Sequence, residues 1–414
     1  MPQARLRTGS KTRQVNEKIA LGFGNNIDYE IVWDSSVLED LIIEYDIHQN
    51  ELDVNRVVNS ERDLVISILA FLQSDSGGER FVASSAIVES FSQRFENKIT
   101  LGGTSVRAAI AMRKLGYTSA LHLVTINDHV RRLLPRDCSY VCSNEKESSY
   151  PHLIVQYGKN TRVSAGDVDI SSIHPNRIIY HSDYDNIRML LDESFAALIT
   201  EAKVLLVSGF NAMQDETLLL KRLESLVRMM ASLPANAVVF YEEAGFYEPG
   251  FCQTIYSALA DHIDIVSLNE DEMQHHLGRK LDLLNAFQIR DALVELQALI
   301  PIPVIVVHTK YWAIAYGENA TRFRRALKAG TTLATTRFRY GDDFTAENYR
   351  EIESRAPRED SAAFSNIMNS LSSNELCCVP VPDVEQSNGT TIGLGDAFVG
   401  GFLPAIVHDA GISS

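Results

Sequence analysis

IDIVSLNEDEM, residues 263–273, shows the pattern on which the fold prediction rests. Its first half is a short isoleucine and valine run typical of a buried strand, and its acidic second half can begin a helix. Similar apolar runs recur at 119–126, 203–208, 237–241 and 303–308. Most of these runs are separated by helical stretches such as 214–232 and 283–299. Alternating strands and helices predict a doubly wound α/β fold, in which a mostly parallel sheet carries helices on both faces.

Two regions interrupt this alternation and predict a smaller α/β lid domain. The first, 29–100, is mostly helical and follows KIALGFGNNID (18–28), which predicts a buried strand ending in a turn. The second, 150–180, has the pattern of strand pairs joined by polar turns. We expect a lid made of 29–100 and 150–180, and a large nucleotide-binding domain made of 1–28, 101–149 and 181–414. The helices expected in the lid are 36–47, 54–73 and 81–95, with a polar break at 74–80.

Composition and charge restrict the classes of function. The 414 residues are 45% hydrophobic, which is enough for a large core and more than one domain. The net charge of −16 argues against duplex nucleic acid as a partner, because such binders need a basic surface. No apolar run approaches the roughly 20 residues of a membrane span. The five cysteines lack paired spacing, so we expect reduced thiols in a cytoplasmic protein. The basic first 14 residues favour a disordered tail over a targeting peptide.

GLGDAFVGGF, residues 393–402, contains a single acid, Asp396, shortly after Gly393 and Gly395. Glycines let the backbone approach an anion closely, and the free N–H groups at a helix start point towards it. A carboxylate there can take the proton of a hydroxyl while the N–H groups stabilise a phosphoryl group. The structural alternative is that Asp396 caps the helix.

GFGNNID, residues 22–28, puts polar side chains at the end of the first strand. It lacks the third glycine of a dinucleotide-binding G-x-G-x-x-G motif, and no helix follows at once, so a nicotinamide site is not expected. Asn25, Asn26 and Asp28 suit hydrogen bonds to several hydroxyls of a polyol. An Asx turn is the structural alternative.

ITLGGTSVRAA, residues 99–109, repeats the pattern of glycines before a helix. Gly102 and Gly103 would let the backbone approach a ligand, with Thr104 as a polar neighbour. Arg107 follows one turn into the helix, where it meets either an anion or solvent, and solvent is slightly favoured.

Acids follow two of the apolar strands. Glu242 comes directly after 237–241, and Asn269 and Glu272 follow 263–267 three positions apart. These oxygens suit Mg²⁺, which keeps much of its water shell in proteins. Helix capping by Asn269 and the acids after it is the alternative.

Taken together, these motifs resemble the ribokinase-like sugar kinases. In chain order the matches are GFGNNID, LGGTSVRAAIAMRKLG, LNEDE for the family's N-x-x-E, and GLGDAF for its G-x-G-D. The branch of ADP-dependent glucokinases and phosphofructokinases resembles the chain more closely than the ATP-dependent branch. FYEEA (240–244) is similar to its H-x-E motif, and VIVVHTKYWAIAYG (304–317) to its His-Thr strand and hairpin.

Two lengths favour the same branch. Asp28 and Gly102 are 74 positions apart (102 − 28), whereas ATP-dependent relatives have a much shorter lid there. Only 18 residues follow Asp396 (414 − 396), whereas those relatives continue through further helices.

The resemblance implies Mg²⁺-dependent transfer of the terminal phosphate of ADP to a hydroxyl of glucose or fructose 6-phosphate, with release of AMP. It implies that Asp396 is the base and that the backbone of Gly393 and Gly395 forms the anion hole. The residues implied to hold the sugar are Asn26, Asp28, Gly102, Gly103 and Thr104. Those implied to organise Mg²⁺ are Glu242, Asn269 and Glu272. Those implied to contact the nucleotide are Arg177, in PNRIIY, and Thr309.

Two departures from the family pattern keep other hypotheses open. The histidine of H-x-E is Phe240 here, and the Gln or Asn after the glycine pair is Thr104. The alternatives are an ATP-dependent kinase of the same superfamily acting on another alcohol, and a non-catalytic carbohydrate-binding protein on the same fold. A sugar-phosphate acceptor would also need a basic pocket, for which Lys159, Arg162 and Arg107 are candidates. No pattern indicates the number of subunits.

Overall fold

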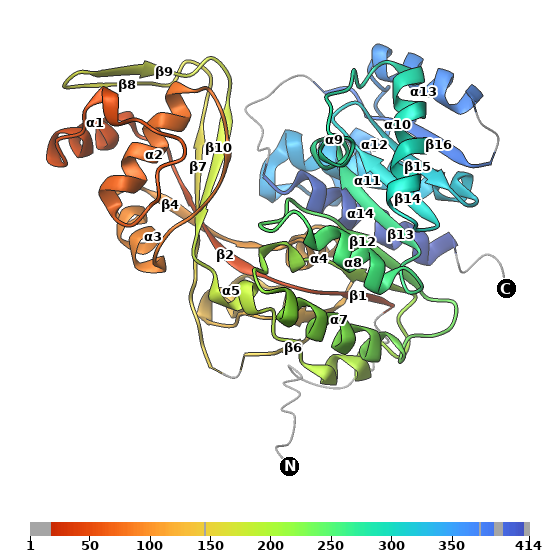
Figure 1. Ribbon diagram of the computed structural model, residues 1–414. Helices are drawn as coiled ribbons and strands as arrows, with labels where there is room; N and C mark the ends of the chain where they lie inside the picture. The colour runs from red at the N-terminus through yellow and green to blue at the C-terminus, as the bar shows by residue number, and fades with distance from the viewer. Residues whose placement is uncertain (1–17, 145, 372–373, 385–391, 410–414) are drawn as a thin grey trace.

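A nine-stranded sheet forms the centre of the larger part of the molecule (Figure 1). The structure is a computed structural model and describes residues 18–144, 146–371, 374–384 and 392–409. The strand order is β16-β15-β14-β13-β12-β11-β1-β5-β6, and all strands run in the same direction except β15, which is antiparallel to both of its neighbours. The strands are β1 (Ile19–Leu21), β5 (Ala120–Leu123), β6 (Ser139–Cys142), β11 (Val204–Val207), β12 (Val238–Glu242), β13 (Ile265–Asn269), β14 (Val304–His308), β15 (Trp312–Gly317) and β16 (Leu376–Pro380). The predicted fold class is confirmed.

Helices cover both faces of this sheet because successive strand residues point to opposite sides. Leu205 and Val207 of β11 belong to one buried cluster, and Val204 and Leu206 to the other. The helices on the first face are α7 (Glu216–Met230), α8 (Phe251–Leu259), α9 (Glu270–Leu277), α10 (Ala286–Leu299) and α13 (Glu359–Leu371). Those on the second are α4 (Thr104–Lys114), α5 (Asp128–Leu133), α11 (Arg324–Tyr340) and α14 (Leu394–Asp409).

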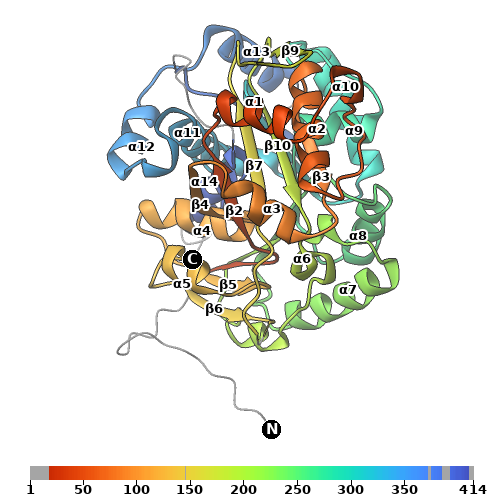
Figure 2. The ribbon, with the colours of Figure 1, turned by 90° about the vertical axis from the view of Figure 1, so that its left-hand side faces the viewer.

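A second sheet of five strands lies beside the first, with its own layer of helices (Figures 1 and 2). Its order is β3-β10-β7-β2-β4, formed by β2 (Asn26–Ile31), β3 (Gly78–Phe81), β4 (Asn97–Gly102), β7 (His152–Tyr157) and β10 (Asn176–His181). The elements on its outer face are α1 (Ser35–Glu44), α2 (Glu61–Gln73), α3 (Ser85–Ser92) and the hairpin of β8 (Arg162–Ala165) and β9 (Val168–Ser171). Its inner face is turned towards the large sheet (Figure 1).

The remaining helices are short. They are α6 (Tyr184–Arg188), α12 (Ala346–Glu353) and the 3-10 turns η1 (Gln49–Glu51), η2 (Glu193–Ala197), η3 (Phe210–Ala212), η4 (Ala320–Phe323) and η5 (Gly341–Asp343).

The chain passes from the large sheet to the small one between β1 and β2. Gly24, at φ +81°, redirects the backbone here, so residues 18–28 contribute to two strands in two sheets instead of one strand and a turn. Asn25 secures the passage: its Oδ1 accepts from the N–H of Val124 at 2.8 Å and of Thr125 at 3.1 Å, and its Nδ2 donates to the Thr125 carbonyl at 3.0 Å. Asn25 therefore has a structural role.

The lid helices are shorter than the sequence predicts. Helix α2 begins at Glu61 instead of residue 54, because Ser60 caps it by accepting from the Asp63 N–H. Helix α3 begins only after Ser84, whose side chain caps it by accepting from the Ala86 N–H. The expected break at 74–80 contains the start of β3, whose partner β10 lies about 100 positions further along the chain. Because the partner strand is so distant, the residues around 78–81 do not by themselves indicate a strand.

Candidate active site

Asp396 lies in the first turn of α14, two residues after the helix begins at Leu394. It is therefore not the N-cap residue. Its Oδ2 lies 3.8 Å from Nε of Arg107 on α4. Gly393, at φ +63°, makes this approach possible, because a Cβ there would lie 2.9 Å from Arg107 Nη1 and 3.0 Å from Asp396 Oδ2. The glycine loop, the acid and an arginine thus meet at one point.

Arg107 is buried, with 9% of its surface exposed, so the preference for solvent was wrong. Its Nη2 lies 2.5 Å from Asp28 Oδ2 and 3.6 Å from Glu30 Oε1. Burial alone would lower the pKa of Arg107, but the carboxylates of Asp28, Asp396 and Glu30 outweigh it and raise the pKa above its usual range. The guanidinium is permanently charged and joins the acid of α14 to the acids of β2.

The residues implied to hold the sugar lie around this arginine. Asn26 Nδ2 donates to Asp28 Oδ1 at 2.6 Å, and both residues lie within strand β2, so the Asx turn is excluded. A Cβ on Gly102 would lie 2.7 Å from Asp28 Oδ2 and closer still to Asn26 Nδ2. Gly103, at φ +88°, caps α4, and Thr104 is the first helical residue. The structure thus brings the five residues together at the ends of β2 and β4.

Glu242 lies at the end of β12, close to the glycine loop. Its Oε1 lies 3.1 Å from His308 Nε2, and its Oε2 is buried without a hydrogen-bond partner. A Cβ on Gly395 would lie 3.4 Å from the His308 ring and 3.9 Å from Glu242 Oε1. His308 also stacks on Phe398 of α14, with ring centroids 4.6 Å apart. His308, which the sequence marked only as part of a longer motif, thus joins Glu242 to α14.

Asn269 and Glu272 form the capping box of α9. Asn269 Oδ1 accepts from the N–H groups of Asp271 and Glu272, and Glu272 Oε2 accepts from the Asn269 N–H at 2.8 Å. Burial raises the pKa of Glu272 well above its usual value; the Asn269 N–H opposes this, and the Glu243 and Glu242 carboxylates add to it. The capping alternative is therefore observed for both residues.

Within the described residues, no group of three or more His, Cys, Asp or Glu side chains is arranged to hold a metal ion directly. The unpartnered Glu242 oxygen nevertheless fits Mg²⁺, which binds through one or two carboxylates, substrate phosphates and water.

The departure at Phe240 has a packing explanation. Its ring is fully buried and lies 5.2 Å from that of Phe402 on α14, so this side chain belongs to the core beneath the site.

The two residues implied to contact the nucleotide differ in their surroundings. Thr309 Oγ1 accepts from the N–H groups of Tyr311 and Trp312 and so shapes the turn between β14 and β15. Arg177 lies on β10. Its pKa is lowered mainly by burial and also by the charge of Arg107, while the carboxylate of Asp396 opposes this shift. Arg177 therefore shares the electrostatic environment of Arg107 and Asp396.

A group of acids and imidazoles next to Asp28 was missed by the sequence analysis. His152 is paired with Asp28 in the register of β7 and β2, stacks on His181 at 4.6 Å, and its Nε2 lies 2.9 Å from Asp183 Oδ2. His181, 2% exposed, has Nε2 2.8 Å from Glu79 Oε1, but neither ring nitrogen has a partner in hydrogen-bonding geometry. Glu79, His152 and His181 come from β3, β7 and β10, and Asp183 caps α6, so no local motif marks the group.

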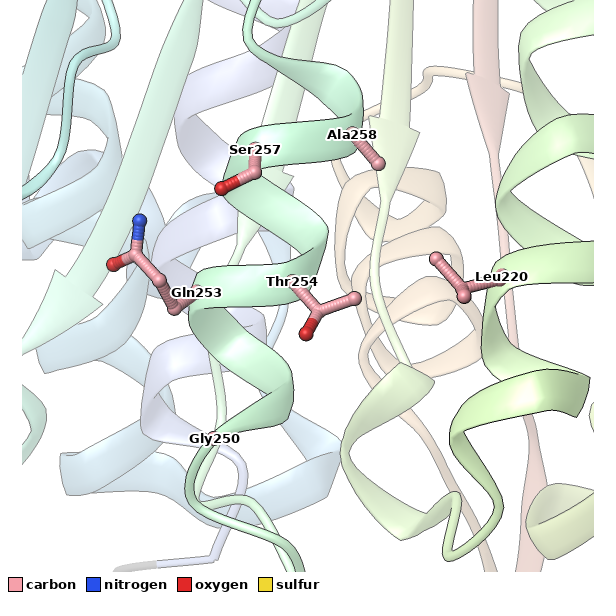
Figure 3. Close-up of a pocket in the computed structure, with 6 residues that line it drawn as sticks. All are labelled: Leu220, Gly250, Gln253, Thr254, Ser257 and Ala258. Atoms are coloured by element: carbon pink, nitrogen blue, oxygen red, sulfur yellow. The ribbon is translucent and has the colours of Figure 1, made fainter.

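Two of the cations considered for a sugar phosphate lie elsewhere. Lys159 and Arg162 are exposed at the turn and hairpin after β7, and Arg162 pairs with Asp169 at 2.8 Å. A surface depression between α7 and α8 is lined by Leu220, Gly250, Gln253, Thr254, Ser257 and Ala258 (Figure 3). Its lining contains no charged side chain, and none of the candidate residues belongs to it.

All five cysteines are free thiols. Among the helices of the described residues, none is both long enough and apolar enough to span a bilayer.

Comparison with known proteins identifies the family. Residues 17–403 match the family model described as the ADP-specific phosphofructokinase/glucokinase conserved region. The chain belongs to this family. It is therefore an ADP-dependent sugar kinase, a phosphotransferase with an alcohol group as acceptor, and ADP is its phosphoryl donor.

Solved structures share the fold at low sequence identity. A phosphofructokinase from Pyrococcus horikoshii OT3 with AMP is 16% identical, covers 95% of this chain and 98% of its own, and has a TM-score of 0.75. The last common ancestor of ADP-dependent phosphofructokinases from Methanosarcinales is 13% identical, with 95% and 94% covered and a TM-score of 0.72. An ADP-dependent kinase complex with fructose-6-phosphate and ADPβS is 12% identical, with 94% of both covered and a TM-score of 0.70. No curated protein sequence matches.

Proposed function

We propose that this ADP-dependent kinase phosphorylates a neutral hexose of the glucose type, with Mg²⁺, and releases AMP. The observation that carries the proposal is the junction at Arg107, which links Asp396 of the glycine loop to Asp28 beside Asn26 and Gly102. Arg107 thus holds a base, Asp396, close to polar side chains, Asn26 and Asp28, that can bind the other hydroxyls of a sugar.

The charge balance around Asp28 supports a neutral acceptor. Asp28, Glu30 and Glu79 are carboxylates, and two of them already surround Arg107. The phosphate of a sugar phosphate would be repelled by these acids, whereas hydroxyl groups can donate to them. Fructose 6-phosphate is the second candidate because Arg177 lies near the same network.

The chemistry follows from these positions. Asp396 accepts the proton of the sugar hydroxyl while the hydroxyl oxygen bonds to the β-phosphorus of ADP. The bond between the β-phosphorus and the oxygen that bridges it to the α-phosphorus then breaks, and AMP leaves. The N–H groups of Gly393 and Gly395 stabilise charge on the transferred group. Asn26, Asp28, Gly102, Gly103 and Thr104 orient the sugar, and Arg177 and Thr309 contact the nucleotide.

Mg²⁺ would neutralise phosphate charge during transfer. We assign it to Glu242, whose buried Oε2 has no partner, with Asn269 and Glu272 acting through water at the start of α9. His308 would hold Glu242 in place through its 3.1 Å contact with Oε1.

We also propose that the two sheets mark two domains, with a lid at 29–100 and 150–180. The separate buried cluster beneath α1, α2 and α3 supports this division.

The test is a screen that crosses ADP and ATP with glucose, fructose 6-phosphate, a pentose and a nucleoside, with Mg²⁺ or with EDTA, and measures AMP and phosphorylated product. AMP formed from glucose, and lost with EDTA, supports the proposal. Turnover with fructose 6-phosphate alone supports the second candidate. Activity with ATP and none with ADP would contradict ADP as the phosphoryl donor. Sugar binding without phosphoryl transfer under all conditions would support a non-catalytic protein.

A further inference from the structure

Arg337, on the last turn of α11, contacts the backbone immediately before the glycine loop. Its side chain is buried, and its Nε donates to the Ile392 carbonyl at 2.8 Å. It contacts none of the residues assigned to sugar, metal or base in the contacts found for the described residues. Its importance to the site would therefore come only through the backbone of the loop.

A second contact fixes the direction of the guanidinium. Arg337 Nη1 lies 2.5 Å from Asp342 Oδ1 in η5. Lys98 of β4 pairs with Asp342 Oδ2 at 2.7 Å, and Lys114 of α4 donates to the Asp342 carbonyl. Burial alone would raise the pKa of Asp342, but Arg337 and Lys98 outweigh it and lower the pKa to about 2, so the partner of Arg337 stays ionised at neutral pH.

The peptide between Ile392 and Gly393 transmits this restraint. A trans peptide is planar, and its carbonyl and the following N–H point in opposite directions. When Arg337 Nε binds the Ile392 carbonyl, the Gly393 N–H points away from the Arg337 guanidinium. Gly393 is itself close to Arg107 and Asp396, because a Cβ on it would lie 2.9 Å from Arg107 Nη1 and 3.0 Å from Asp396 Oδ2.

We propose that Arg337 is a positioning residue for phosphoryl transfer, which orients the Gly393 N–H of the anion hole by binding the Ile392 carbonyl. This inference rests on the proposed function of the loop at 393–396. Arginine suits the task because its rigid fork reaches the carbonyl and Asp342 at once, whereas the ammonium of lysine is a single point charge.

The experiment compares Arg337→Met and Arg337→Lys with Arg339→Met, a matched change two residues further along α11 at a side chain that lies over the Tyr340 ring. Turnover is AMP formed from ADP and glucose at saturating substrate, at a temperature where circular dichroism shows each variant folded. Calorimetry with glucose gives the number of binding sites and the Kd, so that kcat is expressed per sugar-binding site.

We expect Arg337→Met to lower kcat per binding site by about 100-fold, the usual effect of misplacing an oxyanion donor, with the Kd for glucose within twofold. Arg337→Lys should recover part of the loss, and Arg339→Met should match the wild type. A kcat per site in Arg337→Met within threefold of the wild type would overturn the role of Arg337 alone. An equal loss in Arg339→Met would also overturn it, because the effect would then be general to α11. A wild type that forms no AMP with any sugar overturns the proposed function, and this inference with it.

Discussion

At the scale of single residues, the site depends on the charges that surround Arg107. Asp396, Asp28 and Glu30 lie within 4 Å of this buried cation. Their other contacts differ. Asp28 is bound by Arg107 and by Asn26, whereas Asp396 has the looser contact and lies at the glycine loop.

Replacing Asp396 by Asn should separate catalysis from binding. The substitution keeps the size of the side chain and removes the proton acceptor, so we expect kcat to fall on the order of 100- to 10,000-fold with the Kd for sugar nearly unchanged. Initial rates of AMP formation and calorimetry measure the two effects. Asp128→Asn, also in the first turn of a helix but fully outside the site, is the matched control. Turnover of Asp396→Asn within threefold of the wild type would contradict the assignment.

His122 should make stability depend on pH. It is buried against Phe23 and Phe195, and burial lowers its pKa from 6.5 to about 4. Between these values the unfolded chain binds a proton that the folded chain does not, so the free energy of unfolding falls as pH falls. The loss reaches about 3 kcal/mol at pH 4.

Urea titrations from pH 7 to pH 4 check this expectation by comparing His122→Gln with the wild type. Glutamine can still accept from the Asp192 N–H, which donates to His122 Nε2 at 2.8 Å, but it does not titrate. The variant should therefore lose less stability with falling pH. His262→Gln, at an exposed histidine, should keep the slope of the wild type. Parallel curves for His122→Gln and the wild type would show that the prediction is wrong.

At the scale of elements, glycines determine how closely helices and strands approach. Gly330 of α11 faces the Phe398 ring of α14, and Gly401 of α14 faces the backbone of Ala329. Helices α4, α11 and α14 pack together beneath the glycine loop. Glycine thus allows the close contacts both at the loop before α14 and along the helix itself.

Gly401→Ala should destabilise the protein. Its Cβ would run into the Ala329 carbonyl oxygen and lie 2.9 Å from the carbonyl carbon, and neither atom belongs to a side chain that can rotate away. Alanine favours a helix by about 1 kcal/mol over glycine, but overpacking against backbone should outweigh this and give a net loss of about 1–2 kcal/mol. Urea unfolding measures the change against Gly158→Ala, whose Cβ would meet nothing nearer than 3.8 Å. Equal or greater stability of Gly401→Ala would contradict the packing argument.

Gly102→Ala should weaken sugar binding. The new methyl group would crowd Asn26 and Asp28 from the end of β4, so we expect the KM for sugar to rise about 10-fold, or roughly 1.4 kcal/mol. Steady-state kinetics at saturating ADP gives the KM, and Gly158→Ala is again the control. An unchanged KM would remove Gly102 from the sugar site.

The sequence predicted the elements of the large sheet better than those of the lid. The apolar runs at 203–208, 263–267 and 303–308 correspond to β11, β13 and β14, because strands buried on both faces need apolar residues throughout. The small sheet is covered by helices on its outer face only, so β3, with sequence GERF, shows no such run. Its pairing with β10 could not be seen locally.

At the scale of the whole molecule, the two sheets lie on either side of the site residues. Asp28 and Gly102 belong to the small sheet, while Glu242 belongs to the large sheet and Asp396 to a helix packed on it. Phe81 of β3 contacts Tyr247, after β12, with ring centroids 4.4 Å apart. The substrate would therefore contact both parts of the molecule.

We expect sugar binding to draw the two sheets together. Water competes with the sugar hydroxyl for the phosphoryl group, so a site that closes on the sugar protects ADP from hydrolysis. Small-angle scattering should give a smaller radius of gyration with glucose and a non-transferable ADP analogue than without ligands. An unchanged radius at saturating ligand would contradict closure.

The sequence by itself determined the α/β class, the order of the motifs and the position of the acid behind two glycines. These features are local: strand periodicity, turn glycines and helix starts are written in neighbouring residues. Only the tertiary structure decided that Arg107 is buried among three carboxylates, that His308 joins Glu242 to α14, and that Glu79, His152 and His181 gather beside Asp28. The physical reason is that charge pairing and burial depend on residues that meet through strand order and helix packing, often more than a hundred positions apart.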